Sequence, residues 1–288
     1  PVPDVESDLD LTSFDGTTIR MHWFPVEDAT ASAPRPTILM GPGWSLPGDT
    51  SLDAVGVLGA INISSLRTAG YNVLTWDPRG FGQSTGTAMV NSVDFEARDV
   101  QQMLSWLSGQ PEVALDGPGD PRSGMVGGSY GGGIQLVTAA IDCRVDALVP
   151  VIAWHSLGTS LYKSEIVKSG WGNVLASVAA TRSVDPHVTS ANEAGKTTGT
   201  LSPEDVEWFE ARGPGELVES IEVPTLFIQG TVDTLFTLDE GITNYRILRD
   251  KGVPTSLFFY CGGHGVCLTE EGDLDRLGVA AIGWLDRY

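Results

Sequence analysis

The feature that most constrains the fold is an alternation of short apolar runs with longer amphipathic segments. The apolar runs are rich in β-branched and aromatic residues and mostly do not alternate with polar residues, which is typical of strands covered on both faces. They lie at 37–40, 72–76, 123–126, 147–152, 225–228 and 256–260. Helical patterns separate them, at 52–68, 95–108, 132–141, 238–249 and 273–287. This order predicts a mostly parallel sheet with right-handed crossovers.

Two further strand patterns open the chain. Residues 9–13 and 18–24 flank Asp15-Gly16, which is the two-residue signal of a β-hairpin. This hairpin and the six buried runs together predict an α/β protein with an eight-stranded, mostly parallel sheet that is flanked by helices. The hairpin lies at one edge of that sheet.

The segment from 155 to 218 breaks the alternation. It carries Trp171, Trp208 and Phe209 among scattered polar residues, and it is too long for a plain connection. We expect residues 1–154 and 219–288 to form the core and residues 155–218 to form a helical cap, inserted after the sixth strand. A separate small domain is the weaker alternative. The aromatic residues of the cap either line a pocket or attach the cap to the core.

The charge balance argues against several classes of partner. Seventeen Lys and Arg against 37 Asp and Glu give a net charge of −20, which repels nucleic-acid phosphates and anionic lipid. We expect no nucleic-acid partner and no membrane partner, and the sequence leaves the oligomeric state open. The chain starts at Pro1 without a basic patch and an apolar run. We therefore expect that any targeting peptide was removed or is not part of this sequence, and that the protein is secreted or extracellular.

The three cysteines leave one pairing open. Cys261 and Cys267 flank the run Gly-Gly-His-Gly-Val, which is short enough for a small disulfide loop, whereas Cys143 lies far away in the sequence. The alternative is that Cys261 and Cys267 are buried free thiols. A disulfide would indicate an oxidising compartment.

The strongest functional signal is Gly-Gly-Ser-Tyr-Gly-Gly at 127–132. It contains G-x-S-x-G between a predicted strand and a predicted helix, which is the context of a nucleophile elbow. Such a turn strains the backbone of the serine, and the glycines two residues to either side let strand and helix approach closely. We therefore predict that Ser129 is a nucleophile exposed at the carboxyl edge of the sheet.

A serine nucleophile needs an imidazole as its base. Only His264 follows the last predicted strand, where the chain order serine, acid, histidine of G-x-S-x-G hydrolases places the base. His22 lies in the opening hairpin and His187 in the cap. His155, at the start of the cap, is the alternative that could reach the pocket.

The imidazole in turn needs a carboxylate that fixes its tautomer. Asp233 comes three residues after the buried strand that ends at Gly230, and this places it at the same edge as His264. Asp239 and Glu240 are predicted to open the next helix, where the helix dipole favours acidic residues without a catalytic role.

Acyl transfer also needs hydrogen-bond donors for the developing oxyanion. The backbone N–H of Tyr130 is one predicted donor. The backbone N–H of Trp44, in the loop Gly-Pro-Gly-Trp after the third strand, is the other, with Gly43 as the alternative if the register differs by one.

The remaining polar motifs indicate structure more than chemistry. Asp77-Pro78-Arg79-Gly80 could resemble an acid–base site, but we expect it to form a structural ion pair and a turn that brace the elbow. The histidines and cysteines lack zinc spacing, and no G-x-G-x-x-G motif follows the first strand of a dinucleotide unit. We expect neither a metal nor a cofactor.

Taken together, these motifs resemble the α/β-hydrolase superfamily, and within it the branch that contains cocaine esterase and X-prolyl dipeptidyl peptidases. The resemblance spans about 8–288 and rests on four motifs: Asp-Pro-Arg-Gly-Phe-Gly-Gln-Ser at 77–84, the elbow at 127–132, Gly-Thr-Val-Asp at 230–233 and Gly-His-Gly at 263–265. It implies an α/β-hydrolase fold and a catalytic triad of Ser129, Asp233 and His264.

Two departures from this branch affect its specificity. Members of the branch carry a tyrosine in the oxyanion loop, where this chain has Trp44, and a jelly-roll domain after the hydrolase core. The sequence ends at Tyr288 with that core and leaves open whether a C-terminal domain was removed. The resemblance therefore supports the peptidase specificity of the branch for this chain less strongly than it supports the catalytic residues.

The resulting functional hypothesis is a serine hydrolase that cleaves carboxylic esters through an acyl-enzyme. Its substrate is expected to be a small-molecule or peptide-like acyl compound. The second hypothesis is a peptidase similar to X-prolyl dipeptidyl peptidases. The third, from another class, is a catalytically silent hydrolase fold that binds a ligand. The sequence does not identify the acyl group or the leaving group of the substrate.

Overall fold

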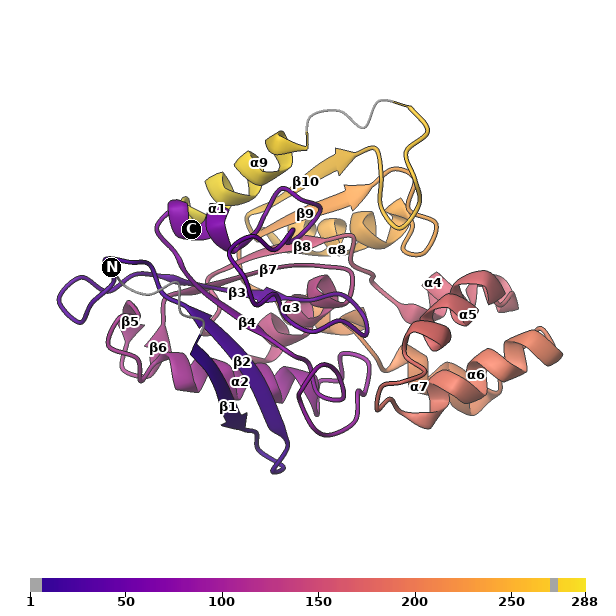
Figure 1. The fold of residues 1–288 in the computed structure, drawn as a ribbon. Coiled ribbons are helices and arrows are strands. Elements are labelled where there is room, and N and C mark those ends of the chain that lie inside the picture. The colour runs from indigo at the N-terminus through magenta and orange to yellow at the C-terminus, as the bar shows by residue number, and fades with distance from the viewer. Residues whose placement is uncertain (1–6, 270–273) are drawn as a thin grey trace.

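The computed structural model describes residues 7–269 and 274–288. In these residues an eight-stranded sheet forms the centre of the molecule, in the order β1-β2-β4-β3-β7-β8-β9-β10 (Figure 1). Its strands are β1 (Ser7–Thr12), β2 (Thr18–Phe24), β3 (Thr37–Gly41), β4 (Asn72–Trp76), β7 (Ser123–Gly128), β8 (Ala147–Val151), β9 (Thr225–Gly230) and β10 (Thr255–Tyr260). The pairs β1–β2 and β2–β4 are antiparallel and the other pairs are parallel. The predicted eight-stranded, mostly parallel sheet is thus confirmed.

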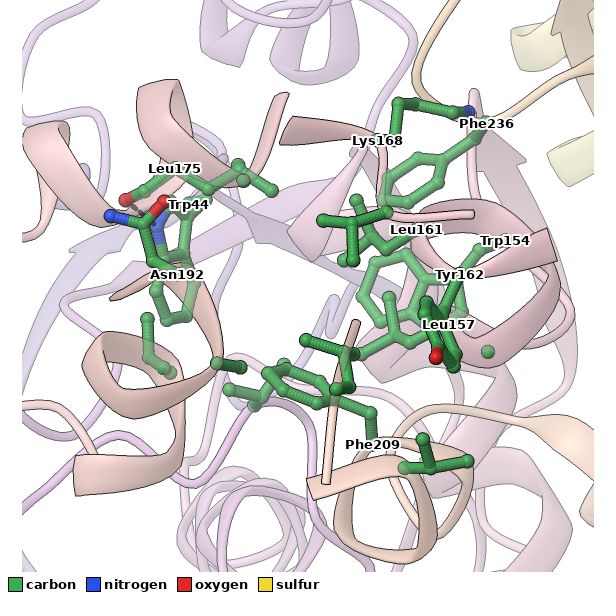
Figure 2. Close-up of a pocket in the computed structure, with 18 of the residues that line it drawn as sticks. Trp44, Trp154, Leu157, Leu161, Tyr162, Lys168, Leu175, Asn192, Phe209 and Phe236 are labelled. Atoms are coloured by element: carbon green, nitrogen blue, oxygen red, sulfur yellow. Dashed lines mark hydrogen bonds between the residues drawn. The ribbon is translucent and has the colours of Figure 1, made fainter. Parts of the chain in front are cut away.

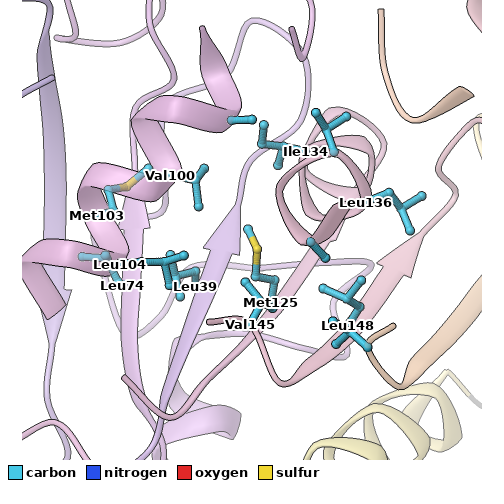
Figure 3. Close-up of a cluster of buried hydrophobic side chains, with 14 of the residues drawn as sticks. Leu39, Leu74, Val100, Met103, Leu104, Met125, Ile134, Leu136, Val145 and Leu148 are labelled. Atoms are coloured by element: carbon cyan, nitrogen blue, oxygen red, sulfur yellow. The ribbon is translucent and has the colours of Figure 1, made fainter. Parts of the chain in front are cut away.

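Helices cover both faces of the sheet. On one face, α2 and α3 pack on β3, β4, β7 and β8 through a buried apolar cluster, part of which Figure 3 shows. On the other face, α1 and α9 pack through a second cluster. The helices of the core are α1 (Ile63–Thr68), α2 (Glu96–Leu107), α3 (Tyr130–Ile141), α8 (Leu238–Lys251) and α9 (Asp275–Leu285). None of the helices in the described part of the chain is both long and apolar enough to cross a lipid bilayer.

The helix expected at 52–68 is wrong over most of its length, because α1 begins only at Ile63. Upstream of it, Gly56, Leu58 and Gly59 have φ between 55° and 73°, a left-handed backbone that an α-helix does not tolerate. Asn62 caps the start of the helix, because its side chain accepts a hydrogen bond from the Ser65 N–H. The small hairpin of β5 (Leu115–Gly117) and β6 (Asp120–Pro121) was not predicted.

The motif at 77–80 forms the structural ion pair and turn that its sequence indicates. Both Asp99 carboxylate oxygens accept hydrogen bonds from the buried Arg79 guanidinium at 2.7 Å, and a third guanidinium nitrogen donates to Asp15 in the opening hairpin at 3.1 Å. The buried carboxylate of Asp77 accepts hydrogen bonds from the N–H groups of Gly48 and Gln83 at 2.9 and 2.7 Å. These contacts join the edge hairpin, the loop after β3 and α2 beside the carboxyl ends of the strands.

A group of helices lies between β8 and β9, and we call this segment, residues 155–218, the cap. Figure 1 shows these helices beyond the carboxyl ends of β7 and β8. They are α4 (Leu157–Leu161), η1 (Lys163–Glu165), α5 (Ser169–Val178), α6 (Pro186–Thr197) and α7 (Pro203–Glu210). The short helix η2 (Gly215–Ser220) follows them and packs on the core, because its Val218 belongs to the first apolar cluster. The buried Glu240 of α8 holds the start of the cap, because its carboxylate accepts hydrogen bonds from the N–H groups of His155 and Ser156 and from the Thr159 hydroxyl.

The cysteine pairing that the sequence left open is resolved as a disulfide between Cys261 and Cys267. Cys143 is exposed and unpaired. The disulfide closes the loop that follows β10, and His264 lies at the middle of that loop.

Candidate active site

The site begins at the sharp turn between β7 and α3. Ser129 connects the two elements with φ 55° and ψ −112°, a strained conformation for a residue with a side chain. Three backbone hydrogen bonds hold the turn: the Ser129 N–H donates to the Val151 carbonyl at 2.9 Å, and the Ser129 carbonyl accepts from the N–H groups of Gly132 and Gly133, each at 2.9 Å. The strand, turn and helix predicted around Ser129 therefore exist as the elbow motif requires.

The glycines beside the serine are required by close backbone contacts. A Cβ atom on Gly131 would lie 2.1 Å from the carbonyl oxygen of Gly41 in β3. A Cβ atom on Gly127 would lie 2.6 Å from the carbonyl oxygen of Gly131 and 2.7 Å from that of Gly41. Because these neighbours are backbone atoms, they cannot move aside as the end of a flexible side chain can. The steric reason inferred from the G-x-S-x-G spacing is thus visible in the structure.

We expect the substitution Gly131→Ala to lower the free energy of unfolding by roughly 2–3 kcal/mol, because overpacking against backbone outweighs the gain in helix propensity. Gly283→Ala is the matched control, since Gly283 also lies inside a helix but a Cβ atom there meets nothing within 4 Å. The control should be neutral or slightly stabilising. Urea denaturation of both variants measures the difference, and equal midpoints would contradict the steric account.

The structure brings Ser129, His264 and Asp233 together in one hydrogen-bonded chain. The Nε2 atom of His264 lies 2.8 Å from the Ser129 Oγ, and its Nδ1 atom lies 2.7 Å from the Asp233 Oδ2. A carboxylate cannot donate, so Nδ1 carries the hydrogen. In the neutral imidazole Nε2 then has a free lone pair, which can accept the Ser129 hydroxyl proton.

The carboxylate of Asp233 is held in place by backbone donors. Its Oδ1 atom accepts hydrogen bonds from the N–H groups of Leu235 and Phe236 at 2.9 and 2.7 Å, and its Oδ2 atom accepts from the His264 N–H at 3.2 Å. The side chain is fully buried. Gly263 lets the histidine loop approach, because a Cβ atom there would lie 2.6 Å from the Cβ atom of Asp233. This arrangement fixes the orientation of the imidazole.

Two aromatic rings pack edge-on against the His264 ring. Phe236, which follows the Asp233 turn, has its ring centroid 5.1 Å away, and Trp171 of α5 has its centroid 5.8 Å away. The Trp171 indole N–H also donates to the Thr234 hydroxyl at 3.2 Å. The cap therefore contacts both the base and the loop that carries the acid.

The other candidate residues lie in different contacts. His155 faces the Asn244 side chain at 2.7 Å, His22 lies between Asp8 and Asp77, and His187 stacks on Trp208. Asp239 lies in the first turn of α8, is exposed and pairs with Lys163 of the cap. These positions agree with the preference for His264 and Asp233.

The two residues predicted to supply the oxyanion donors line the same pocket as the nucleophile. Tyr130 is the first residue of α3, so its N–H belongs to the turn that has no intrahelical acceptors. The Trp44 ring lies 5.2 Å from the Tyr130 ring, and its indole N–H donates to the Leu175 carbonyl of α5 at 3.0 Å. The indole group is thus engaged with the cap. Donation by the backbone N–H groups of Trp44 and Tyr130 stays a prediction.

An apolar pocket opens between the nucleophile and the cap. Ser129 and Tyr130 lie at its base, and Figure 2 shows aromatic and aliphatic side chains around it, among them Trp44, Trp154, Leu157, Leu161, Phe209 and Phe236. The single ionised side chain among the described lining residues is Lys168, whose ammonium donates to the Leu235 carbonyl at 2.9 Å. No carboxylate lines the described part of this pocket.

Sequence reasoning missed Glu96, a buried carboxylate close to Tyr130. Its position in the first turn of α2 gave no signal, because acidic residues are common there for the helix dipole alone. Burial raises the pKa of Glu96 to about 7, against the backbone N–H groups that lower it. Nothing local to its sequence indicates which side chains it faces.

The fold and the family together define an α/β hydrolase. A profile of the family described as X-Pro dipeptidyl-peptidase (S15 family) matches residues 15–266, which is most of the chain. The chain therefore belongs to this family, and the resemblance seen in the sequence motifs is confirmed.

Individual relatives agree with this assignment. The chain is 30% identical to the polyketide transferase GrgF from Penicillium over 147 residues, which are 50% of this chain. It spans 44% of the length of that relative, and 37% of a second polyketide transferase from Gibberella fujikuroi.

Two solved structures show the fold. The α/β hydrolase GrgF superposes with a TM-score of 0.67 at 18% identity, over 98% of each chain. An esterase from Pyrococcus furiosus superposes with a TM-score of 0.66 at 19% identity, over 99% of this chain and 91% of the esterase. The predicted α/β-hydrolase fold is thus confirmed.

Proposed function

We propose that the protein is a serine hydrolase that cleaves carboxylic esters through an acyl-enzyme intermediate. The observation that carries the proposal is the chain of hydrogen-bonding distances from Ser129 to His264 and from His264 to Asp233, 2.8 and 2.7 Å long. A nucleophile, a base and an orienting acid at these distances form the arrangement needed to activate a hydroxyl group. The strained elbow holds the hydroxyl at the base of the apolar pocket.

In the first half of the proposed reaction, the Ser129 Oγ attacks the ester carbonyl carbon while its proton moves to the Nε2 atom of His264. Asp233 stabilises the imidazolium that forms. The carbonyl oxygen becomes an oxyanion, which accepts hydrogen bonds from the backbone N–H groups of Tyr130 and Trp44. His264 then returns the proton to the leaving alkoxide, and an alcohol departs.

In the second half, water attacks the acyl-enzyme. His264 takes a proton from this water, and the tetrahedral intermediate collapses with release of Ser129, which regains its proton from the imidazolium. The products are a carboxylic acid and an alcohol, and the enzyme returns to its starting state.

The pocket favours a neutral, apolar acyl group. Aromatic and aliphatic side chains form most of its lining, and such walls gain free energy from burying an apolar ligand. A dipeptidyl peptidase has to hold the ammonium group of a peptide N-terminus, and burying that group unpaired is costly. The described pocket offers it no carboxylate and instead carries the ammonium of Lys168. Ester hydrolysis is therefore preferred.

Peptidase activity of the X-prolyl dipeptidyl type is the second candidate, and the family match favours it. The two candidates are separated by parallel assays of an aryl ester with an apolar acyl chain and of a Gly-Pro anilide. We expect kcat/KM for the ester to exceed that for the anilide by at least about 10²-fold, since each 1.4 kcal/mol of differential transition-state binding is worth tenfold. A higher kcat/KM for the anilide would contradict the proposal and support the peptidase.

A further inference from the structure

A strained loop at 89–92 contacts the residue that follows the nucleophile and lines part of the pocket. Val90 and Asn91 have φ values of 61° and 53°, and this left-handed backbone is costly, above all for a β-branched residue. The Val90 side chain lines the apolar pocket. The Asn91 side chain donates to the carbonyl oxygen of Tyr130 at 2.8 Å, and the Asn91 N–H lies 3.3 Å from the Tyr130 hydroxyl. The loop thus touches both the substrate pocket and the residue that follows the nucleophile.

The side chain that holds this loop is Glu96, which is 3% exposed. One of its carboxylate oxygens accepts hydrogen bonds from the Met89 N–H at 2.5 Å and from the Tyr130 hydroxyl at 3.3 Å. The other oxygen accepts from the Ser92 N–H at 2.9 Å. Glu96 therefore accepts hydrogen bonds on both sides of the strained pair and from the Tyr130 hydroxyl as well. The proposed reaction uses none of these contacts directly.

We propose that Glu96 is a positioning residue of the active site, whose ionised carboxylate holds Tyr130 and the strained loop at 89–92 so that the Tyr130 N–H points at the oxyanion. The inference rests on the proposed function, because it assigns Tyr130 a role in the acyl-transfer step. Glu96 acts through Tyr130 and does not touch the substrate.

The charge state of Glu96 decides how well it does this. The ionised carboxylate accepts from all three donors. A protonated carboxyl group is itself a donor at one oxygen, so it has one acceptor site fewer for them. Burial, with a smaller contribution from the neighbouring carboxylate of Asp99, raises the pKa of Glu96 to about 7 against the backbone N–H groups that lower it. The cations that face the same site are Arg79, which pairs with Asp99, and Arg212, which lies against Trp208. Protonation of Glu96 should therefore occur near neutral pH and should loosen the loop.

The test combines Glu96→Gln with the pH profile of ester hydrolysis. In the glutamine, the amide NH₂ group replaces one of the two oxygens that now accept from the backbone N–H groups of Met89 and Ser92. One of these N–H groups then faces a donor instead of an acceptor, so the loop cannot keep its conformation. We expect kcat to fall by about 10- to 100-fold with KM changed by less than about threefold, which is typical of a displaced catalytic group. In the wild-type protein a proton on His264 abolishes activity and a proton on Glu96 lowers it by the same factor of about 10 to 100, so log kcat/KM should fall in acid with a slope that exceeds 1 over the pH range in which Glu96 takes up its proton. In Glu96→Gln the slope should not exceed 1.

A second variant keeps the inference testable if Glu96→Gln does not fold. Tyr130→Phe removes one donor to the carboxylate, so the charged form loses a stabilising contact and the ionisation assigned to Glu96 should move to higher pH. Tyr71→Phe is the matched control, because it removes a hydroxyl that donates to the Asp286 carboxylate, outside the site. Its pH profile should match that of the wild-type protein.

An unchanged kcat in folded Glu96→Gln, or a slope that still exceeds 1 as in the wild-type protein, would overturn the inference, as would an unchanged profile in Tyr130→Phe. Failure of the proposed function is a different result. In that case the wild-type Ser129 would not react with a fluorophosphonate. If the wild-type protein and Glu96→Gln both react, at equal rates and with equal pH dependence, the hydrolase proposal stands and the inference about Glu96 falls.

Discussion

Replacing Ser129 by alanine is expected to lower kcat for ester hydrolysis by about 10⁶-fold, as removal of a serine nucleophile does in serine proteases. The substitution removes the Oγ atom that would form the acyl-enzyme, and leaves the backbone turn in place. That atom lies 2.8 Å from the Nε2 atom of His264. Because the turn is held by backbone contacts of Ser129, we expect the fold to be retained. Initial-rate assays and thermal unfolding of the same preparation measure the two effects.

Ser64→Ala is the control for this variant. Ser64 is an exposed residue of α1, and its hydroxyl donates to the carbonyl of Leu52 in the preceding loop. This control should keep the wild-type kcat. If a well-folded Ser129→Ala variant kept more than about 1% of the wild-type kcat, the acyl-enzyme mechanism would be wrong.

The second large effect is expected for Asp233→Asn, which should lower kcat by about 10³- to 10⁴-fold. Oδ1 accepts from two backbone N–H groups, so the asparagine would keep its oxygen there and turn its amide nitrogen toward the Nδ1 atom of His264. An amide N–H needs an acceptor, which favours the tautomer with the hydrogen on Nε2. Such a histidine cannot take the proton of Ser129.

Asp239→Asn is the matched control for the acid, because Asp239 is the exposed aspartate at the start of α8. It should retain near-normal kcat. Near-normal turnover in Asp233→Asn, combined with a loss in Asp239→Asn, would move the role of the orienting acid to Asp239. Steady-state kinetics on the two variants decide between these outcomes.

The sequence predicted the sheet and the candidate triad because their signals are local. Buried parallel strands appear as short apolar runs, and the elbow needs glycines at fixed offsets from Ser129, because Gly41, Gly127 and Gly131 approach within contact distance of one another. The acid and the base follow predicted strands at the same edge of the sheet, so their order alone placed Asp233 and His264 correctly beside Ser129.

Features that depend on contacts between distant segments could not be predicted. The apolar pattern at 52–62 resembles a helix, yet the left-handed residues around Leu58 interrupt it. The contacts of Glu96 with the strained loop and with Tyr130 join three elements, and no spacing along the chain shows them. The disulfide between Cys261 and Cys267 stayed open for a different reason: a separation of six residues allows the bond but does not show how the loop between them turns.

From the sequence, the aromatic residues of the cap either line a pocket or attach the cap to the core, and in the structure they differ in their contacts. Phe209 lines the pocket, and Trp171 packs against His264. Trp208 stacks on His187 and faces the Arg212 guanidinium within the cap. A sequence pattern cannot separate these roles, since each ring is apolar and half-buried in either case.

The most direct test of the central claim is intact-protein mass spectrometry after reaction with a fluorophosphonate, followed by peptide mapping. Our account predicts one adduct on the wild-type protein, located on the peptide that contains Ser129, and no adduct on Ser129→Ala. Absence of labelling in well-folded wild-type protein, or a label on a different serine, would contradict it and would favour a hydrolase fold that binds a ligand without catalysis.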